Sequence, residues 1–429
     1  MVKAWQFLGQ HRRWGIVVLL AGFSIVNYLD RQALSVLAPT LRKELGISVE
    51  QYSYVVSTFL TAYAIGYAIA GKTLDRFGVK LGLAAALAFW SLIGMAHAAV
   101  VGWLSLAAFR FLLGLGQSFN SPGGMKSLAE WIPPRERGLC SAIFSNANSL
   151  GNVLAPPIVG GLALWLGWRW TFVIVGASGF ILLAIWWRVY DPPETQRGLS
   201  AAERSLILQT RSSAAQAVPE VTATYWEILR NPLCLGLCLS RLITDPFAYF
   251  ISFWLVEYFQ SVRGFSLQTV ALLAWIPPLA SPLLGGPLGG ILSDWMVGRG
   301  IDSRVARLRL MIGSACFMPL ALVAVHTTHT WVAVATVALL VAANACWSVN
   351  KLTLASEIVP RSQVASLVSL GGIAGSIGGI VSTLVAGRLI ATVGYVPVFT
   401  GLGFLHLTAF GVLWLTLRAS PDGLMGVRK

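Results

Sequence analysis

The sequence predicts an all-α integral membrane protein with twelve transmembrane helices in two pseudo-symmetric six-helix bundles. Three observations predict this fold class: the composition, the succession of apolar segments and a repeated motif. Hydrophobic residues make up 56% of the chain, charged residues 11%, and the mean hydropathy is +0.71. A soluble globular chain carries about 25% charged residues. So few charges cannot cover a water-facing surface, and lipid must be the main solvent of this chain.

The apolar segments define the predicted helices, because a membrane-spanning helix needs about 20 mostly apolar residues. They cover residues 14–38, 52–71, 80–101, 103–125, 138–164, 168–189, 232–260, 267–292, 307–327, 330–350, 363–389 and 396–417. Six precede and six follow the one long polar stretch. We therefore expect an N-terminal bundle over 1–189, a cytoplasmic interdomain loop over 190–229 and a C-terminal bundle over 230–429. Within the loop, GLSAAERSLIL at 198–208 predicts a short amphipathic helix.

The net charge of +14 would suggest nucleic acid as the partner of a soluble protein. In a membrane protein, Lys and Arg instead gather on the cytoplasmic side. With the N-terminus inside, the cytoplasmic segments hold 21 basic residues and the outer segments hold five. This bias predicts that both termini are cytoplasmic and removes nucleic acid as a partner. No cleavable signal peptide is evident, because the apolar run after the basic start continues through Asp30 and Arg31 without a small-residue cleavage site.

An internal repeat supports the two-bundle interpretation. GKTLDRFGVK (71–80) follows the second span, and GGILSDWMVGRG (289–300) ends the eighth. Both place glycine, aspartate and a basic residue where a helix leaves the membrane on the cytoplasmic side, so Gly71, Asp75, Arg76 and Asp294 are candidate gating residues. Glycine permits close helix approach, and we expect each Asp to contact a helix N-terminus and an Arg of the other half. A polar turn would explain one copy, whereas two copies at matching positions favour a gate.

On these motifs the chain resembles the major facilitator superfamily over essentially its full length. Further stretches resemble its anion:cation symporter family, and within that family the hexuronate-transporter branch. They are NYLDRQALSVLAP (27–39), RFLLGLGQSFNSPGGMKSLAEWIPPRERG (110–138), GWRWTF (167–172), RLITDPFAYFISFWLVEYFQSVRGFSL (241–267) and WSVNKLTLASEIVPRSQVASLVSLGGIAGSIGG (347–379). The resemblance implies a transporter of the bacterial inner membrane. Related branches that carry aldonates, aldarates or other small carboxylates share much of this pattern.

Charged residues inside the spans are the first candidates for chemistry, because a charge within a membrane helix is expensive and marks a pathway or a relay. Asp30 and Arg31 lie deep in the first span, and Arg110 begins the membrane part of the fourth. Neighbouring residues project about 100° apart on a helix. We expect Arg31 to point into a central cavity, with a guanidinium that matches a carboxylate, and Asp30 to face Arg110. This arrangement suits proton-coupled anion transport; a structural ion pair between the two spans is the alternative.

Gln117 departs from the family pattern, in which the position two turns after Arg110 is usually Glu. Glutamine forms hydrogen bonds but neither releases nor accepts a proton at physiological pH. Proton coupling must therefore rest mainly on Asp30, or be weakened, or be absent. The resemblance assigns substrate binding to Tyr28, Arg31, Tyr63, Gln117, Asn148, Trp347 and Asn350. In such a site, rings stack on a sugar and amides bind its hydroxyls.

Other polar residues allow more than one interpretation. Lys126 is expected to bind substrate or to close the cytoplasmic side. Asp245, followed by Pro246, is expected to cap a break in the seventh span. Four charged residues near helix ends are expected to reach the membrane interface: Glu257, Arg263, Lys351 and Glu357. In the eleventh span, the spacing of Gly371, Gly375 and Gly379 predicts a smooth face for close packing or for a flexing gate.

The resulting functional hypothesis is import of a small organic anion, most of all a sugar acid such as galacturonate or glucuronate, by proton symport with alternating access. An exporter, uniporter or anion exchanger for a related aldonate, aldarate or carboxylate is the second hypothesis. The third is a sensor that binds but does not carry. We find no nucleotide-binding, metalloprotease or nucleophile motif and therefore expect no enzyme, no catalytic residue, no cofactor and no metal site. The expected partners are the anion, protons and the lipid bilayer, with the chain as a monomer.

Overall fold

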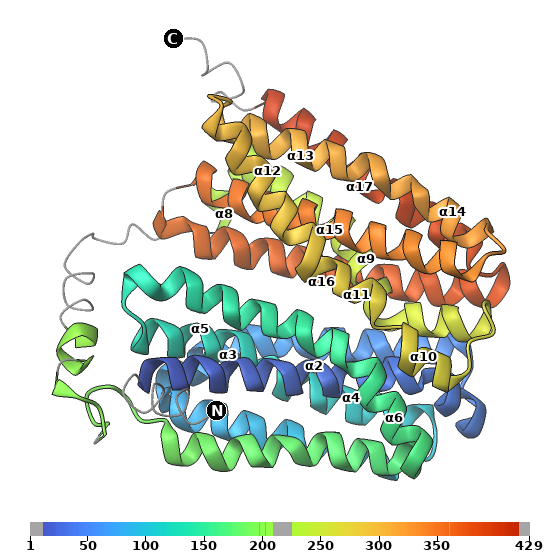
Figure 1. Ribbon diagram of the computed structural model, residues 1–429, viewed down its shortest axis with the longest axis horizontal. Helices are drawn as coiled ribbons and strands as arrows, with labels where there is room; N and C mark the ends of the chain where they lie inside the picture. The colour runs from blue at the N-terminus through green and yellow to red at the C-terminus, as the bar shows by residue number, and fades with distance from the viewer. Residues whose placement is uncertain (1–11, 197, 202, 209–224, 360, 420–429) are drawn as a thin grey trace. The chain divides into compact units, whose positions relative to one another are not determined.

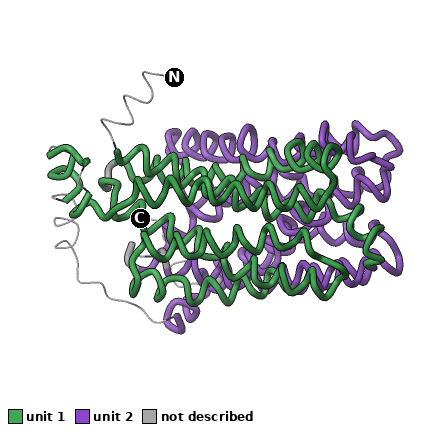
Figure 2. Tube along the Cα trace, turned by 90° about the horizontal axis from the view of Figure 1, so that it is seen from below, with its two compact units in different colours: residues 1–47, 58–219 green, residues 48–57, 220–429 purple. Residues whose placement is uncertain are grey.

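The computed structural model describes residues 12–196, 198–201, 203–208, 225–359 and 361–419 (Figure 1). The chain divides into two compact units, one of residues 1–47 and 58–219 and the other of residues 48–57 and 220–429 (Figure 2). Within the second unit, the hydroxyl of Tyr52 donates to the carbonyl of Phe253 at 2.8 Å. The domain boundaries expected at 189 and 229 stay a prediction. The expected cytoplasmic termini fall on residues 1–11 and 420–429, outside the described residues, as do positions 209–224 of the loop.

The long helices of the first unit are α2 (Arg12–Leu45), most of α3 (Val49–Ala96), α4 (Trp103–Gln117), α5 (Asn120–Trp131) and α6 (Pro134–Val189). The second contains α8 (Tyr225–Arg230), α9 (Pro232–Ser261), α10 (Leu267–Leu273), α11 (Ile276–Ala280), α12 (Gly286–Gly298), α13 (Ser303–Phe317), α14 (Ala321–His326), α15 (Thr330–Ile358), α16 (Arg361–Thr392) and α17 (Val396–Ala419). No strand occurs in the described part of the chain.

The predicted all-α membrane fold is confirmed. In the described residues, nine helical segments are long and apolar enough to span a membrane. Two of them are double: α3 breaks at Gly78 (φ 75°) and α6 breaks at Gly167 (φ 79°). Only glycine adopts such angles at little cost, so each of these segments supplies two predicted spans. Because α4 and α5 together cover the span expected at 103–125, all twelve predicted spans have a helical counterpart in the described chain.

Prolines account for the irregular spans. Pro122 has no N–H to donate to the carbonyl of Ser118, and the helix is interrupted there between α4 and α5. The eighth span passes through the short α11 and a π-helical turn at Ser281–Gly285, where prolines again remove donors. The break expected in the seventh span does not occur, because α9 continues through Pro246. Asp245 is therefore not a cap and has side-chain partners instead, as described below.

The loop segment after α6 packs on the first unit. Residues 203–208 are helical, within the amphipathic helix expected at 198–208. The carboxylate of Glu203 accepts the backbone N–H groups of Arg12 and Arg13 at 3.3 and 3.2 Å, and it pairs with the Arg13 guanidinium at 3.0 Å. An acidic group at a helix N-terminus satisfies donors that have no partner within the helix. Glu203 thus caps α2 from the loop.

The glycines of α16 face α9. A Cβ at Gly375 would lie 2.1 Å from Asp245 Oδ2, and a Cβ at Gly379 would lie 2.3 Å from the Tyr249 ring. No real side chain tolerates such contacts without a shift of the neighbour. The smooth face predicted from the sequence is therefore present, and in this structure it serves close packing of α16 on α9.

Gly375→Ala is expected to destabilise the protein by roughly 1–3 kcal/mol, the usual cost of overpacking. The clash is with a carboxylate that two cations hold in place, so the side chain cannot swing away. Thermal unfolding in detergent measures the effect. Gly401→Ala in α17 is the matched control, because a Cβ there meets no atom within 4 Å. Equal unfolding midpoints for Gly375→Ala and wild type would contradict the prediction.

Candidate functional site

The charged centre of the first unit lies on α2. Asp30 and Arg31 are neighbours there, and both are buried, with 4% and 8% exposure. The Asp30 carboxylate lies against α3, since a Cβ at Gly94 would be 3.4 Å from its Oδ1. Arg110 on α4 is fully buried. It donates from Nη1 to the carbonyl of Arg31 at 3.3 Å. Arg110 therefore stabilises the backbone of this turn of α2.

The guanidinium of Arg31 lies among aromatic rings. Its Cζ is 4.6 Å from the ring centre of Tyr28, 4.6 Å from that of Tyr63 and 5.2 Å from that of Phe59. Aromatic faces attract a cation and also exclude water from it. The structure thus brings Tyr28, Arg31 and Tyr63 together, on α2 and α3. We call these three residues the Arg31 site.

Tyr67 extends the Arg31 site and was not singled out from the sequence. Its ring lies 5.0 Å from that of Tyr63. The signal was present, because Tyr67 is four residues after Tyr63 and therefore shares its helix face. Phe59, four residues before Tyr63, completes the same aromatic stripe on α3.

Gln117 is fully buried and bonds to the backbone of α2. Its Nε2 donates to the carbonyl of Asn27 at 3.2 Å, and Asn27 Nδ2 donates to the carbonyl of Gln117 at 3.3 Å. This reciprocal pair joins α2 and α4 one turn before Arg31. Asn27 is another residue that sequence reasoning missed; an amide in an apolar span was the available signal.

Asn148 lies near the Arg31 site from α6. It is half-buried, one turn before Gly151 on the same helix face. A Cβ at Gly151 would lie 2.6 Å from the Cβ of Tyr28, so Tyr28 packs directly on the backbone of α6. The Oδ1 atom of Asn148 is buried and has no hydrogen-bond partner in the described structure. An unsatisfied buried amide oxygen is costly unless a donor reaches it, and a substrate hydroxyl would be such a donor.

Trp347 and Asn350 lie on α15 in the second unit. Trp347 is fully buried in a hydrophobic cluster and packs edge-on against His406 with ring centres 5.2 Å apart. Asn350 is also fully buried, and its Nδ2 donates to the carbonyls of Cys346 (2.9 Å) and Gly289 (3.3 Å). These contacts pack α15, and the assignment of both residues to substrate binding stays a prediction.

The candidate gating residues have partners within their own units. In the first unit the Lys126 ammonium contacts the Asp75 carboxylate and donates to the carbonyl of Leu74 at 3.1 Å. This placement favours closure of the cytoplasmic side over substrate binding as the role of Lys126. Gly71 has open space around its Cα. The Arg76 guanidinium lies 5.3 Å from the Phe77 ring centre.

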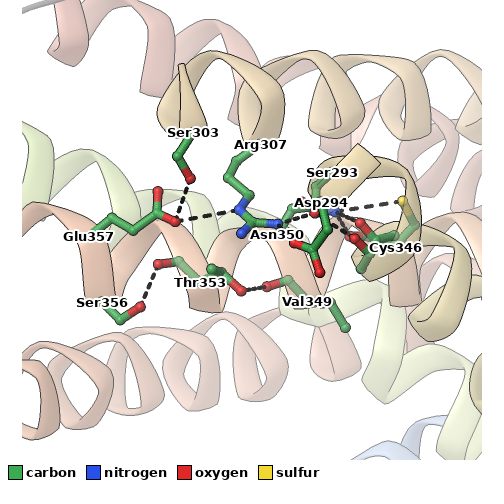
Figure 3. A network of polar contacts seen from close by, with 12 residues as sticks. Ser293, Asp294, Ser303, Arg307, Cys346, Val349, Asn350, Thr353, Ser356 and Glu357 are labelled. Carbon is green, nitrogen blue, oxygen red and sulfur yellow. Dashed lines mark hydrogen bonds and ion pairs between the residues drawn. The ribbon is translucent and has the colours of Figure 1, made fainter. Parts of the chain in front are cut away.

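In the second unit, Asp294 lies in a polar network around Arg307 (Figure 3). Arg307 Nη1 is 3.5 Å from Asp294 Oδ1, and Arg307 Nε is 3.6 Å from Glu357 Oε1. Ser303 donates to the same Glu357 oxygen at 2.7 Å. Arg307 thus connects α12, α13 and α15, and the repeat motif in both units ends in a carboxylate paired with a cation of its own unit.

Two charged residues near helix ends do not reach the membrane interface as expected. Glu257 is buried, with 2% exposure, and Lys351 is buried, with 7%. Lys351 Nζ lies 3.0 Å from Asp245 Oδ1, which holds it inside the second unit. A buried ion pair explains the difference, because the long Lys side chain turns toward a carboxylate rather than toward water. In the described residues, no cluster of three or more metal-ligating side chains occurs.

Comparison with known proteins gives related transporters over most of the chain. The family described as Major Facilitator Superfamily matches residues 20–350. The hexuronate transporter of Escherichia coli K12 is 30% identical over 95% of both chains. The galacturonate transporter of Dickeya chrysanthemi is 33% identical over 65% of this chain and 81% of its own. A probable galactarate/D-glucarate transporter of E. coli K12 is 28% identical over 89% of both.

Solved structures share the fold at low sequence identity. The inward-open xylose transporter XylE from E. coli superposes with a TM-score of 0.72, at 16% identity, over 94% of this chain and 96% of that one. A bacterial homologue of the lysosomal transporter Spinster, inward-facing and occupied, gives a TM-score of 0.70 at 18% identity over 95% of both chains. At these identities the likeness concerns the fold alone.

Proposed function

The chain belongs to the Major Facilitator Superfamily, and from this premise we propose that it imports a sugar acid, a hexuronate such as galacturonate or glucuronate, by proton symport. It is a multi-pass membrane transporter, and the inner membrane of a bacterium is its expected location. In the proposal both termini are cytoplasmic, the chain acts as a monomer, and transport proceeds by alternating access. The named relatives that carry hexuronate and galacturonate support the choice of substrate.

The observation that carries the proposal is the Arg31 site. Arg31 is a permanently charged, desolvated cation, and it offers a planar fork of donors to a carboxylate. Around it, Tyr28 and Tyr63 present ring faces suited to the C–H surface of a sugar. The free amide oxygen of Asn148 is assigned to a sugar hydroxyl. Trp347 and Asn350 stay proposed substrate-binding residues of the second unit.

Asp30 is the proposed proton carrier. Its carboxylate is buried, which disfavours the ionised form, whereas the positive charge of Arg110 favours it, so a change in the balance of the two moves a proton onto or off Asp30. A substrate carboxylate that binds Arg31 offsets the positive charge next to Asp30. Binding of the anion and protonation of Asp30 are thereby linked through one turn of α2.

Uptake of radiolabelled galacturonate into proteoliposomes tests the proposal. We expect accumulation when the outside is acidic relative to the inside, and little accumulation without the gradient. Uptake that ignores the proton gradient would support the exchanger or uniporter. Binding without any uptake would support a sensor.

Gln117→Glu is expected to make uptake more strongly dependent on external pH. Gln117 Nε2 now donates to the carbonyl of Asn27, and a glutamate can donate there only while it is protonated. Each protonation change would therefore break or restore a contact between α2 and α4. Initial uptake rates measured from pH 5 to 8 check this, with wild type as the control. Identical pH profiles for wild type and Gln117→Glu would show that residue 117 does not affect proton coupling.

A further inference from the structure

A second charged cluster lies in the second unit, outside the Arg31 site. Asp245 on α9 sits between two cations: Arg241 Nε is 3.0 Å from its Oδ2, and Lys351 Nζ on α15 is 3.0 Å from its Oδ1. Lys351 also donates to Thr244 Oγ1 at 3.3 Å. Arg241, one turn before Asp245, donates from Nη1 to the carbonyl of Val368 on α16 at 3.2 Å. We call Arg241, Asp245 and Lys351 the α9–α15 centre.

The α9–α15 centre has a net charge of +1. In the described part of the chain, Asp245 is the carboxylate that pairs with both cations, so two positive charges meet one negative charge. The Lys351 and Asp245 side chains are 9% and 19% exposed. All three residues lie in apolar helices long enough to span the membrane. A net charge in that environment is costly and is found mainly where a ligand or a transported ion compensates it.

A structural ion pair alone does not require this arrangement. One cation on α9 or on α15 would suffice to neutralise Asp245, and one cation and one carboxylate would already join the two helices. The second cation therefore adds charge without being needed for neutrality. Glycines on α16 make room for it, since a Cβ at Gly371 would lie 2.8 Å from Arg241 Cδ and one at Gly375 would lie 2.1 Å from Asp245 Oδ2.

A cavity of about 330 Å³ lies beside the centre, lined by residues of α9, α15 and α16. Its lining includes all three charged residues, with Ser348, Leu237 and Gly371. Ligand pockets begin at about 300 Å³, so the space admits a small organic acid. The polar groups of the lining gather at the centre, while much of the remaining wall is aliphatic.

We propose that the α9–α15 centre binds the carboxylate group of a small organic anion. A bound carboxylate brings the centre to neutrality, with two cations and two carboxylates. Arg241 and Lys351 donate to it, and Asp245 keeps both cations in place when it is absent. The proposal rests on the proposed function for the identity of the anion, but not for the existence of the centre. The carboxylate is either the second one of a transported diacid such as galactarate or that of a separate small acid.

Binding of galacturonate, galactarate and acetate to the purified full-length protein, measured by calorimetry, tests this. Lys351→Met is expected to weaken carboxylate binding at least tenfold, because it removes a charge-assisted hydrogen bond and leaves a neutral pair. Lys351→Arg keeps the charge and is expected to stay within about threefold of wild type. Arg241→Met provides an independent variant, which leaves the Lys351–Asp245 pair and is expected to show the same loss. Lys43→Met, which removes an exposed charge at the end of α2, is the matched control and should bind like wild type.

The three anions distinguish the sources of the carboxylate. Loss of galactarate binding by Lys351→Met and Arg241→Met, without acetate binding by wild type, assigns the carboxylate to the transported diacid. Acetate binding that depends on Lys351, with unchanged sugar-acid affinity, assigns it to a separate small acid. Affinities of Lys351→Met and Arg241→Met equal to wild type for all three anions would overturn the proposal, and so would a wild type that binds none of them. Failure of the proposed function alone looks different: no sugar acid binds or is taken up, yet Lys351-dependent acetate binding persists.

Discussion

Arg31→Gln is expected to weaken binding of galacturonate by at least about 30-fold and to abolish its uptake. Arg31 is the buried cation of the first unit whose guanidinium lies among Tyr28, Tyr63 and Phe59. A charge-assisted pair in a site from which water is excluded contributes about 2–5 kcal/mol when one partner is removed, which corresponds to a factor of 30 to several thousand. Calorimetry and proteoliposome uptake measure the two effects.

The matched control for Arg31 is Arg169→Gln. Arg169 also lies against an aromatic ring, with its Cζ 4.2 Å from the Trp168 ring centre, but it is exposed at the surface of the first unit. Its loss should leave affinity and uptake unchanged. Arg31→Lys should fall between the two, because an ammonium keeps the charge but loses the planar fork. An Arg31→Gln protein that binds galacturonate within threefold of wild type would exclude Arg31 from the site.

Asp30→Asn is expected to abolish accumulation driven by a proton gradient while preserving exchange of labelled for unlabelled galacturonate. Asparagine has nearly the shape of aspartate but takes up no proton in the physiological range. Exchange needs only the movement of the loaded transporter, whereas accumulation needs the proton as well. Uptake with an inward proton gradient and equilibrium exchange, measured on the same proteoliposomes, separate the two processes.

The competing view of Asp30 is a structural ion pair, and it predicts a different result. Removal of one member of a buried pair leaves the other charge uncompensated, at a cost of about 3–5 kcal/mol. If Asp30 has only a structural role, the Asp30→Asn protein should therefore lose thermal stability, accumulation and exchange together. Asp191→Asn provides the control, because Asp191 pairs with Lys80 at 2.7 Å where both are accessible. Gradient-driven accumulation by Asp30→Asn at the wild-type level would eliminate Asp30 as the proton carrier.

The helices were predictable because they follow from local rules. Length, apolarity and the breaks at Gly78 and Gly167 depend on short stretches of chain, and a bilayer requires every backbone donor to be satisfied within its own helix. The order and number of spans can therefore be predicted from the sequence. Pro246 shows where the local rule fails. Proline removes one hydrogen bond, but packing against α16 and α17 keeps α9 continuous.

The site was predictable in part. A charge in an apolar span is unusual enough to be seen without a structure, and Asp30, Arg31 and Arg110 were found in that way. Their aromatic neighbours needed helix periodicity and the resemblance together. Tyr67 and Asn27 were missed, because a single tyrosine or amide in a span is usually a packing residue. Their importance depends on which side chain lies opposite, which no spacing rule supplies.

The composition and order of residues in this chain suffice for a multi-pass α-helical protein with a buried cation in its first span. The composition and order of residues do not determine which group pairs with each buried charge. Lys351 shows the reason: its position near a helix end suggested the membrane interface, yet its ammonium lies 3.0 Å from Asp245 Oδ1. That pairing joins residues 106 positions apart. It arises from the packing of α9, α15 and α16, where glycines leave space and burial makes an unpaired charge costly.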